Sequence, residues 1–64
     1  MNWEQEKEYC RRRAQELFAE LEDATERKDK NAFEVAYRKA MRYAAKRELA
    51  PYYKRFLAVM SGRA

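Results

Sequence analysis

Six basic residues at helical spacing are the part of this sequence with the clearest chemical meaning. Four of them fall on one side of a single predicted α-helix, with no acidic residue among them, and two follow in the next predicted helix. They are Arg38, Lys39, Arg42 and Lys46, followed by Lys54 and Arg55. Such a row neutralises successive phosphates of a nucleic acid, or it contacts an acidic protein surface. A solvated helix face that contacts no partner has the same composition, so all three interpretations remain open.

Two adjacent tyrosines, Tyr52 and Tyr53, lie among these basic residues. With Phe56, Leu57 and Met60 they form one apolar face of a helix, and this face is predicted to lie in the core. If the two tyrosines are exposed instead, their rings form a platform on which bases stack or an apolar patch on which a protein docks. They are therefore candidate contact residues for either class of partner.

The residues that catalysis needs are missing or isolated in this sequence. Because the chain has no histidine, its single cysteine, Cys10, has no imidazole base to activate it and no partners for a zinc site. The carboxylates between positions 16 and 23 lie on a helix with nothing predicted to enclose them. The only glycine is Gly62, which excludes a glycine-rich phosphate loop. The sequence predicts a non-enzymatic protein without a metal, a cofactor or a small-molecule substrate.

Helices must position these residues, because 41% of the 64 residues are charged and Gly and Pro occur once each. A first helix is predicted at about 3–28, capped by the side chain of Asn2. Its apolar residues recur at spacings of three and four, which predicts a stripe that is buried in the core or against a second chain. The stripe comprises Cys10, Ala14, Leu17, Phe18, Leu21 and Ala24, and it extends back to Trp3.

A polar stretch at 26–31 predicts the turn to a second helix at about 32–48. Asn31 is predicted to cap this helix, with Glu34 completing a capping box. Pro51 would cost a helix one hydrogen bond, so a third helix is predicted at about 51–60, with one helix kinked at Pro51 as the alternative. The apolar face of the second helix comprises Phe33, Ala36, Tyr37, Ala40 and Ala44.

These elements together predict a single all-α domain over 1–64, in which an antiparallel helical hairpin packs with a short third helix. So small a core is marginal, and no disulfide or metal reinforces it, so a homodimeric bundle is predicted. Residues 1–30 carry seven basic and nine acidic side chains, a net −2, whereas residues 31–64 carry eight and two, a net +6. This difference suits a polyanionic partner for the second half, or attraction between halves of neighbouring chains.

Two functions follow from these features. The first is an adaptor or inhibitor that engages an acidic protein surface, and the second is a dimer that binds DNA or RNA without reading its sequence, through the basic face of the second helix. The apolar runs are too short to span a membrane, and the first residues lack the basic and apolar regions of a secretory signal. Because a lone cysteine is typical of a reducing compartment, a cytoplasmic protein is expected.

Overall fold

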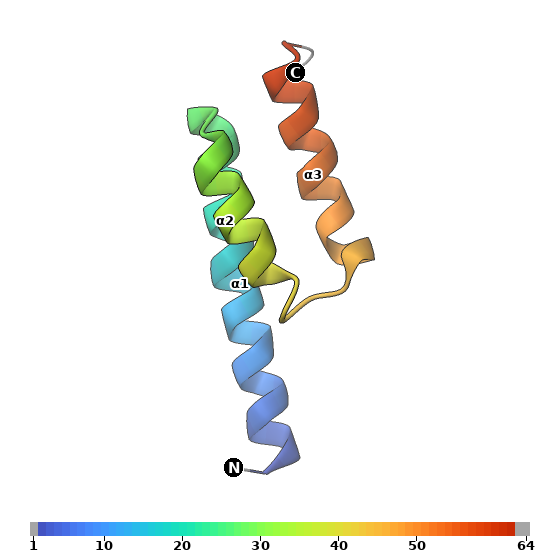
Figure 1. The fold of residues 1–64 in the computed structure, drawn as a ribbon. Coiled ribbons are helices and arrows are strands. Elements are labelled where there is room, and N and C mark those ends of the chain that lie inside the picture. Colours follow the sequence, from blue (N-terminus) through green and yellow to red (C-terminus); the bar gives the residue numbers. More distant parts are fainter. Residues whose placement is uncertain (1, 63–64) are drawn as a thin grey trace.

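Three helices in up-down-up order make up the fold, which is described by a computed structural model for residues 2–62 (Figure 1). Helix α1 spans Trp3–Arg27, α2 spans Lys30–Ala40 and α3 spans Lys46–Met60. Helix α1 packs against both α2 and α3. Residues 2–62 contain no strand, so the predicted all-α class is confirmed.

Both ends of α1 lie where the sequence predicts them. The Asn2 side chain accepts a hydrogen bond from the backbone N–H of Gln5 at 2.9 Å, which satisfies one free donor of the first turn. At the other end Lys28 adopts the left-handed conformation, with φ of 55°. This conformation reverses the chain at once, so that only Lys28 and Asp29 separate α1 from α2.

The cap of α2 differs from the prediction. Asp29, and not Asn31, accepts a hydrogen bond from the backbone N–H of Ala32, at 3.1 Å, and α2 therefore begins at Lys30. Asn31 lies inside the helix and is exposed. A carboxylate at this position also stabilises the positive end of the helix dipole, which explains why Asp29 is the better cap.

The break between the second and third helices lies earlier than predicted. Helix α2 ends at Ala40 rather than near position 48, and α3 begins at Lys46 and continues through Pro51. At the start of α3 the Glu48 carboxylate accepts a hydrogen bond from the backbone N–H of Ala45, at 2.9 Å. The main energetic gain from this arrangement is the complete burial of the Leu49 side chain. Burying a leucine stabilises the fold by about 1.5–3 kcal/mol.

Pro51 is accommodated because it lies in the second turn of α3. Its missing N–H leaves only the carbonyl of Arg47 without its helical partner, and its side chain is exposed. Ala50, which a following proline disfavours in a helix, is nevertheless helical. Tertiary burial of Leu49 therefore outweighs the local preference that predicted a helix start at Pro51.

The core lies in the upper half of the molecule, where all three helices meet (Figure 1). The buried hydrophobic residues are Ala14, Leu17, Leu21, Ala24, Phe33, Ala36, Ala40, Leu49 and Phe56. The small side chains of Ala36 and Ala40, both buried, allow α2 to lie close to α1. One polar residue, Thr25, is also buried, and its hydroxyl donates to the carbonyl of Leu21 at 2.8 Å.

Aromatic rings join α3 to the other two helices. Phe33 of α2 and Phe56 of α3 stack with their ring centroids 4.0 Å apart and their planes within 10°. Phe18 of α1 stacks on Tyr52 of α3 at 4.9 Å. Offset-stacked aromatic pairs contribute about 0.5–1.5 kcal/mol each beyond the area they bury. The third helix is thus held through large side chains rather than through close contact of small ones.

Of the two positions predicted for the stripe, the core of the chain or an interface with a second chain, the core does not extend to Cys10. Cys10 is exposed, and so is Trp3, whose exposed fraction is 71%. The reason is length: α1 has 25 residues whereas α2 has 11, so the first half of α1 extends beyond the turn between α2 and α3 (Figure 1). The chain is accordingly elongated, with principal extents of 45 × 19 × 14 Å.

Replacing Leu49 with alanine is expected to lower the free energy of unfolding by about 2–5 kcal/mol, because it leaves a cavity at a fully buried position. Leu57→Ala is the matched control, since Leu57 lies on the same helix with 47% of its side chain exposed. Urea denaturation followed by circular dichroism measures both changes. Equal effects for the two variants would mean that α3 does not pack through Leu49.

Replacing Pro51 with alanine is expected to raise the free energy of unfolding by about 1 kcal/mol or more, because it restores the hydrogen bond to the Arg47 carbonyl inside α3. The opposite sign is expected if a helix begins at Pro51, where proline is preorganised and costs no hydrogen bond. The same urea titration distinguishes the two, and a loss of stability would contradict a helix that starts at Lys46.

Candidate functional site

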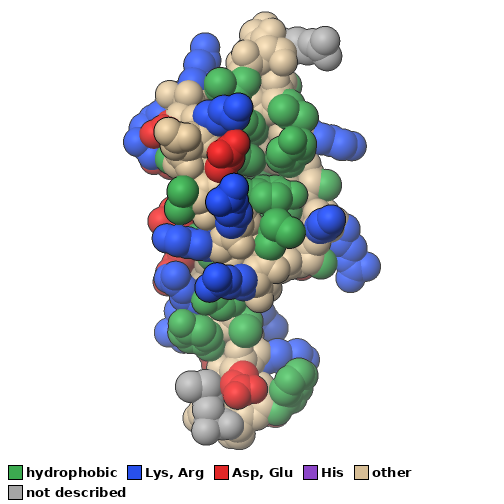
Figure 2. Space-filling model, in the orientation of Figure 1, with side chains coloured by type: hydrophobic (Ala, Val, Ile, Leu, Met, Phe, Trp, Pro, Cys, Tyr) green, Lys and Arg blue, Asp and Glu red, His purple; other side chains and the backbone are tan. Residues whose placement is uncertain are grey.

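The six predicted basic residues are all exposed, but they do not share one helix face. Arg38 and Lys39 lie in the last turn of α2, Arg42 lies in the turn that follows, and Lys46 is the first residue of α3. The prediction of a single row on one helix is therefore wrong, because that helix ends at Ala40. Figure 2 shows Lys and Arg side chains spread over several elements, with hydrophobic side chains between them.

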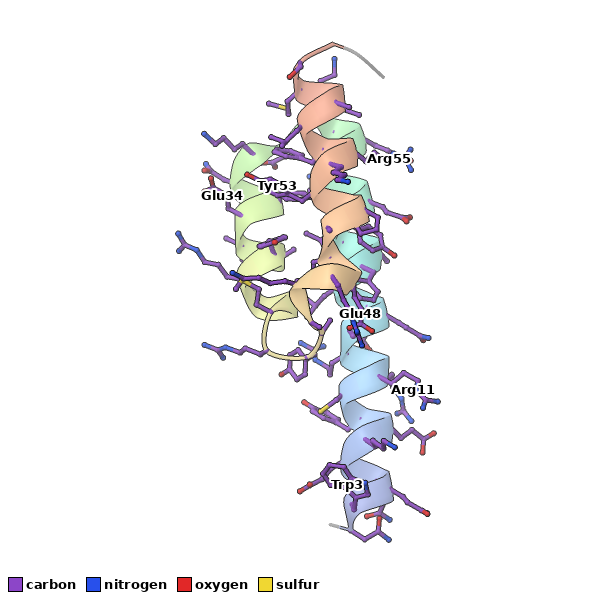
Figure 3. The ribbon with its side chains drawn as sticks, turned by 90° about the vertical axis from the view of Figure 1, so that its right-hand side faces the viewer. Trp3, Arg11, Glu34, Glu48, Tyr53 and Arg55 are labelled. Carbon is purple, nitrogen blue, oxygen red and sulfur yellow. The ribbon has the colours of Figure 1, made fainter. Side chains whose placement is uncertain are left out.

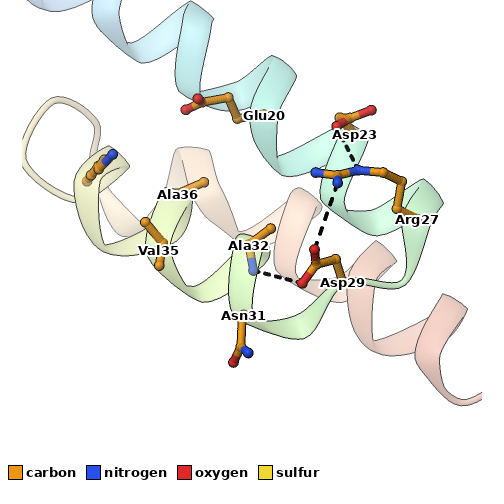
Figure 4. Close-up of a pocket in the computed structure, with 9 residues that line it drawn as sticks. Glu20, Asp23, Arg27, Asp29, Asn31, Ala32, Val35 and Ala36 are labelled. Carbon is orange, nitrogen blue, oxygen red and sulfur yellow. Dashed lines mark hydrogen bonds and ion pairs between the residues drawn. The ribbon is translucent and has the colours of Figure 1, made fainter.

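Lys39 is separated from the other bases by the shape of the surface. It lines a shallow hollow between α1 and α2 together with the acidic residues Glu20 and Asp23. Within that hollow, Arg27 forms ion pairs with Asp23 at 2.9 Å and with the α2 cap Asp29 at 3.8 Å (Figure 4). These contacts fix the turn between the two helices. The charges here are therefore mixed, and Arg27 is already paired with two of the carboxylates.

One basic residue that the sequence prediction omitted joins Lys54 and Arg55. Arg47 is exposed on α3, and at about 100° per residue it lies close to Lys54 and within roughly 80° of Arg55 on the outer side of the helix. Arg55 points away from α2 (Figure 3). We call Arg47, Lys54 and Arg55 the outer basic cluster. The spacing of seven between Arg47 and Lys54 becomes informative only once α3 is known to run through Pro51.

The two adjacent tyrosines have different environments. Tyr52 is half-buried in its stack with Phe18, as a core residue, whereas Tyr53 is 45% exposed and points toward α2 (Figure 3). The Tyr53 ring lies 5.6 Å from that of Tyr37, with their planes tilted by 52°. Leu57 and Met60, predicted to be buried, are 47% and 44% exposed. Tertiary packing therefore covers only part of the predicted apolar face of α3.

Four of these side chains form a continuous apolar surface across α2 and α3. Tyr37 and Tyr53 are in ring contact, and Leu57 and Met60 follow Tyr53 at spacings of four and seven, on the same side of α3. We call these four residues the tyrosine face. Hydrophobic side chains gather between α2 and α3 in Figure 2. An exposed apolar surface of this kind marks a place where another molecule can exclude water.

Basic residues border the tyrosine face. On α3, Lys46 lies two helical turns before Tyr53, and Lys54 lies three residues before Leu57. On α2, Arg38 directly follows Tyr37. Glu34, three residues before Tyr37, also borders this face on α2, whereas Glu48 lies on the opposite side of α3, toward α1. The other described acidic residues belong to α1 or to the Asp29 cap. The border of the tyrosine face is thus positive along α3 and mixed along α2.

Two of the three consecutive arginines of α1 form ion pairs along their own helix. Arg12 pairs with Glu8 at 3.8 Å, and Arg13 pairs with Glu16. The guanidinium carbon of Arg13 also lies 5.9 Å from the centre of the Tyr43 ring. Hydrogen bonding to Tyr43 and to Glu16 raises the pKa of Arg13. Tyr43 thereby ties the turn between α2 and α3 to α1.

Residues 2–62 contain no group of three or more His, Cys, Asp or Glu side chains that is placed to hold a metal ion. The one described thiol, Cys10, is exposed. In the same part of the chain, none of the helices combines the length and apolar character that crossing a bilayer requires.

Comparison of the sequence with models of protein families found no match, and comparisons with curated protein sequences and with solved structures likewise found none. The function must therefore be inferred from the surfaces described above.

Proposed function

We propose that this chain is a small non-enzymatic binding protein, an adaptor or inhibitor whose tyrosine face docks an acidic, amphipathic segment of another protein. The observation that supports this function is the combination on one surface of exposed Tyr53, Leu57 and Met60 with Lys46 and Lys54 along the α3 border. Apolar contact would supply the affinity, and charge would select partners and speed their encounter.

The expected partner follows from the chemistry of the tyrosine face. Tyrosine rings offer apolar area together with a hydroxyl, and they lose little conformational entropy when they are bound, so they are frequent binding hot spots. Lys46, Lys54 and Arg38 lie where carboxylates flanking an apolar segment would contact them. A helix with Leu or Phe along one side and Asp or Glu along its flanks fits both requirements.

A synthetic amphipathic helix of this type should bind, and a peptide of the same composition in shuffled order should not. Because the chain has only 64 residues, NMR shift mapping can follow every described position, and the largest shifts are expected at Tyr37, Tyr53 and Leu57. Tyr53→Ala and Leu57→Ala should each weaken the affinity about tenfold, mainly through faster dissociation. Val35→Ala, at a site that is 53% exposed elsewhere on α2, is the matched control.

The charged border should act differently from the rings. Lys46→Glu and Lys54→Glu should mainly slow association, and the effect should fade as salt is added. Arg12→Glu, on the far side of α1, is the charge control and should leave both rates unchanged. Shifts confined to α1, or unchanged affinity in Tyr53→Ala and Leu57→Ala, would contradict docking on the tyrosine face.

A second candidate function is the binding of DNA or RNA without sequence preference. The outer basic cluster supports it, because Arg47, Lys54 and Arg55 are exposed on the outer side of α3 and residues 31–64 carry a net charge of +6. Phosphate contacts would then come from this cluster, with Arg38, Lys39, Arg42 and Lys46 adding to them. The spread of these residues over several elements favours the protein partner.

Nucleic-acid binding is expected to show a characteristic salt dependence. Each phosphate contact contributes about 0.9 to the slope of log K against log salt for duplex DNA, so Lys54→Ala and Arg55→Ala should each lower that slope by about one. Fluorescence anisotropy with duplex, single-stranded and structured probes measures it. No binding to any of the three at low salt would eliminate this candidate.

A further inference from the structure

Helices α2 and α3 leave the first half of α1 uncovered, and Tyr43 of the turn between them contacts it only at Tyr9 and Arg13. The core stripe of α1 continues downward past Leu17 through Ala14 and Cys10 to Trp3, and at about 100° per residue these last three project within roughly 40° of one another. Ala14 is buried, whereas Cys10 and Trp3 are exposed. Figure 3 shows Trp3 at the free end of α1, beyond α2 and α3. We call residues 3–13 the free segment.

The exposed area of the chain exceeds that of a typical compact protein by about the area of an interface. The accessible surface is 5201 Å², whereas a compact monomer of 7.8 kDa exposes about 4,400 Å² by the scaling of surface with mass. Stable protein interfaces bury about 800 Å² on each partner, which is close to the difference. A partner that covers an interface of ordinary size would thus reduce the exposed area of this chain to that expected for a compact protein of its mass.

Charges beside the free segment select the orientation of a second copy. Glu4 and Arg11 lie on one flank of the stripe, and Glu6 and Arg13 lie on the other, at about 100° per residue. In an antiparallel pair related by a two-fold axis, each flank meets the same flank of the second copy in the opposite direction, so each glutamate meets an arginine. In a parallel pair, residues of opposite flanks meet with an offset of five positions, so Glu6 meets Arg11 but Glu4 and Arg13 meet no opposite charge. The antiparallel orientation therefore pairs all four of these charges, whereas the parallel orientation pairs only two.

A hollow exists where the end of the second copy would lie. Trp3, Lys7, Cys10, Ala14, Phe18 and Tyr43 line it, below the turn between α2 and α3. When Glu4 and Glu6 oppose Arg11 and Arg13, Trp3 of one chain lies over Ala14 of the other. The small alanine leaves room there for the indole, with the Phe18 and Tyr43 rings lining the same hollow. Each chain offers one indole and one hollow, as a symmetric contact requires.

We infer that two copies of this chain pair through their free segments in antiparallel orientation, each inserting Trp3 into the hollow beside Ala14 of the other. This inference does not rest on the proposed function, because the tyrosine face lies on α2 and α3 and stays open in the pair. The dimer would therefore present two tyrosine faces, one at each end of the shared α1 pair.

Light scattering behind size exclusion, together with tryptophan fluorescence, tests the pairing. The mass should rise from 7.8 kDa to twice that value at micromolar chain concentrations, and the emission of Trp3, the only tryptophan, should shift to shorter wavelength over the same range. Trp3→Ala should weaken dimerisation at least tenfold while leaving the helical circular dichroism signal unchanged. Tyr53→Ala should leave the dimerisation affinity unchanged. A chain that stays monomeric up to millimolar concentration would overturn the inference.

Charge reversal tests the orientation. Glu4→Lys with Glu6→Lys should weaken self-association, as should Arg11→Glu with Arg13→Glu, and an equimolar mixture of these two variants should dimerise again. A chain with both charges of one flank reversed, Glu4→Lys with Arg11→Glu, should still pair with itself, because in the antiparallel pair the two reversed positions meet each other. Loss of self-association in that variant would indicate a parallel pair, in which Glu6 would face the carboxylate introduced at position 11, and dimers that are insensitive to Trp3→Ala would place the interface elsewhere. Either result would overturn the inference.

Discussion

The arrangement of α2 and α3 depends on the packing of one aromatic ring, that of Phe33. It is only 1% exposed, it stacks on Phe56 at 4.0 Å, and its centroid lies 5.9 Å from Tyr37 and 6.3 Å from Tyr53. Because rings rather than alanines separate these two helices, their outer aromatic residues cannot all be covered. Tyr53 therefore remains at the surface as a consequence of how the core is built, and the surface proposed for binding is the edge of the same aromatic cluster.

The sequence predicts the parts of this fold that depend on local signals. The cap at Asn2, the end of α1 near Arg27 and the burial of Leu17 and Leu21 all follow from side-chain chemistry and helical spacing. The start of α3 could not be predicted in this way, because the cost of Pro51 is local whereas the gain from burying Leu49 arises only when all three helices are assembled.

The same limit applies to the candidate site. The exposure of Arg38, Lys54 and Arg55 follows from their charge, but their relative placement depends on where α2 ends, which the sequence pattern did not reveal. Cys10 and Trp3 continue a periodic stripe, and periodicity alone does not state how far along α1 the shorter α2 can reach. The lengths of 25 and 11 residues decide that question, and they leave the lower half of the stripe uncovered.

The way α3 is attached has a consequence for how the chain opens. Helices α1 and α2 are joined by a two-residue turn and by close alanine packing, whereas α3 follows a longer turn and contacts its neighbours through long side chains. Helix α3 is therefore expected to be the unit of partial unfolding, and its amide protons are expected to exchange with solvent before those in the middle of the hairpin. A ligand that rests on both Tyr37 and Tyr53 spans the joint between these units, so it would slow that exchange far from the atoms it contacts.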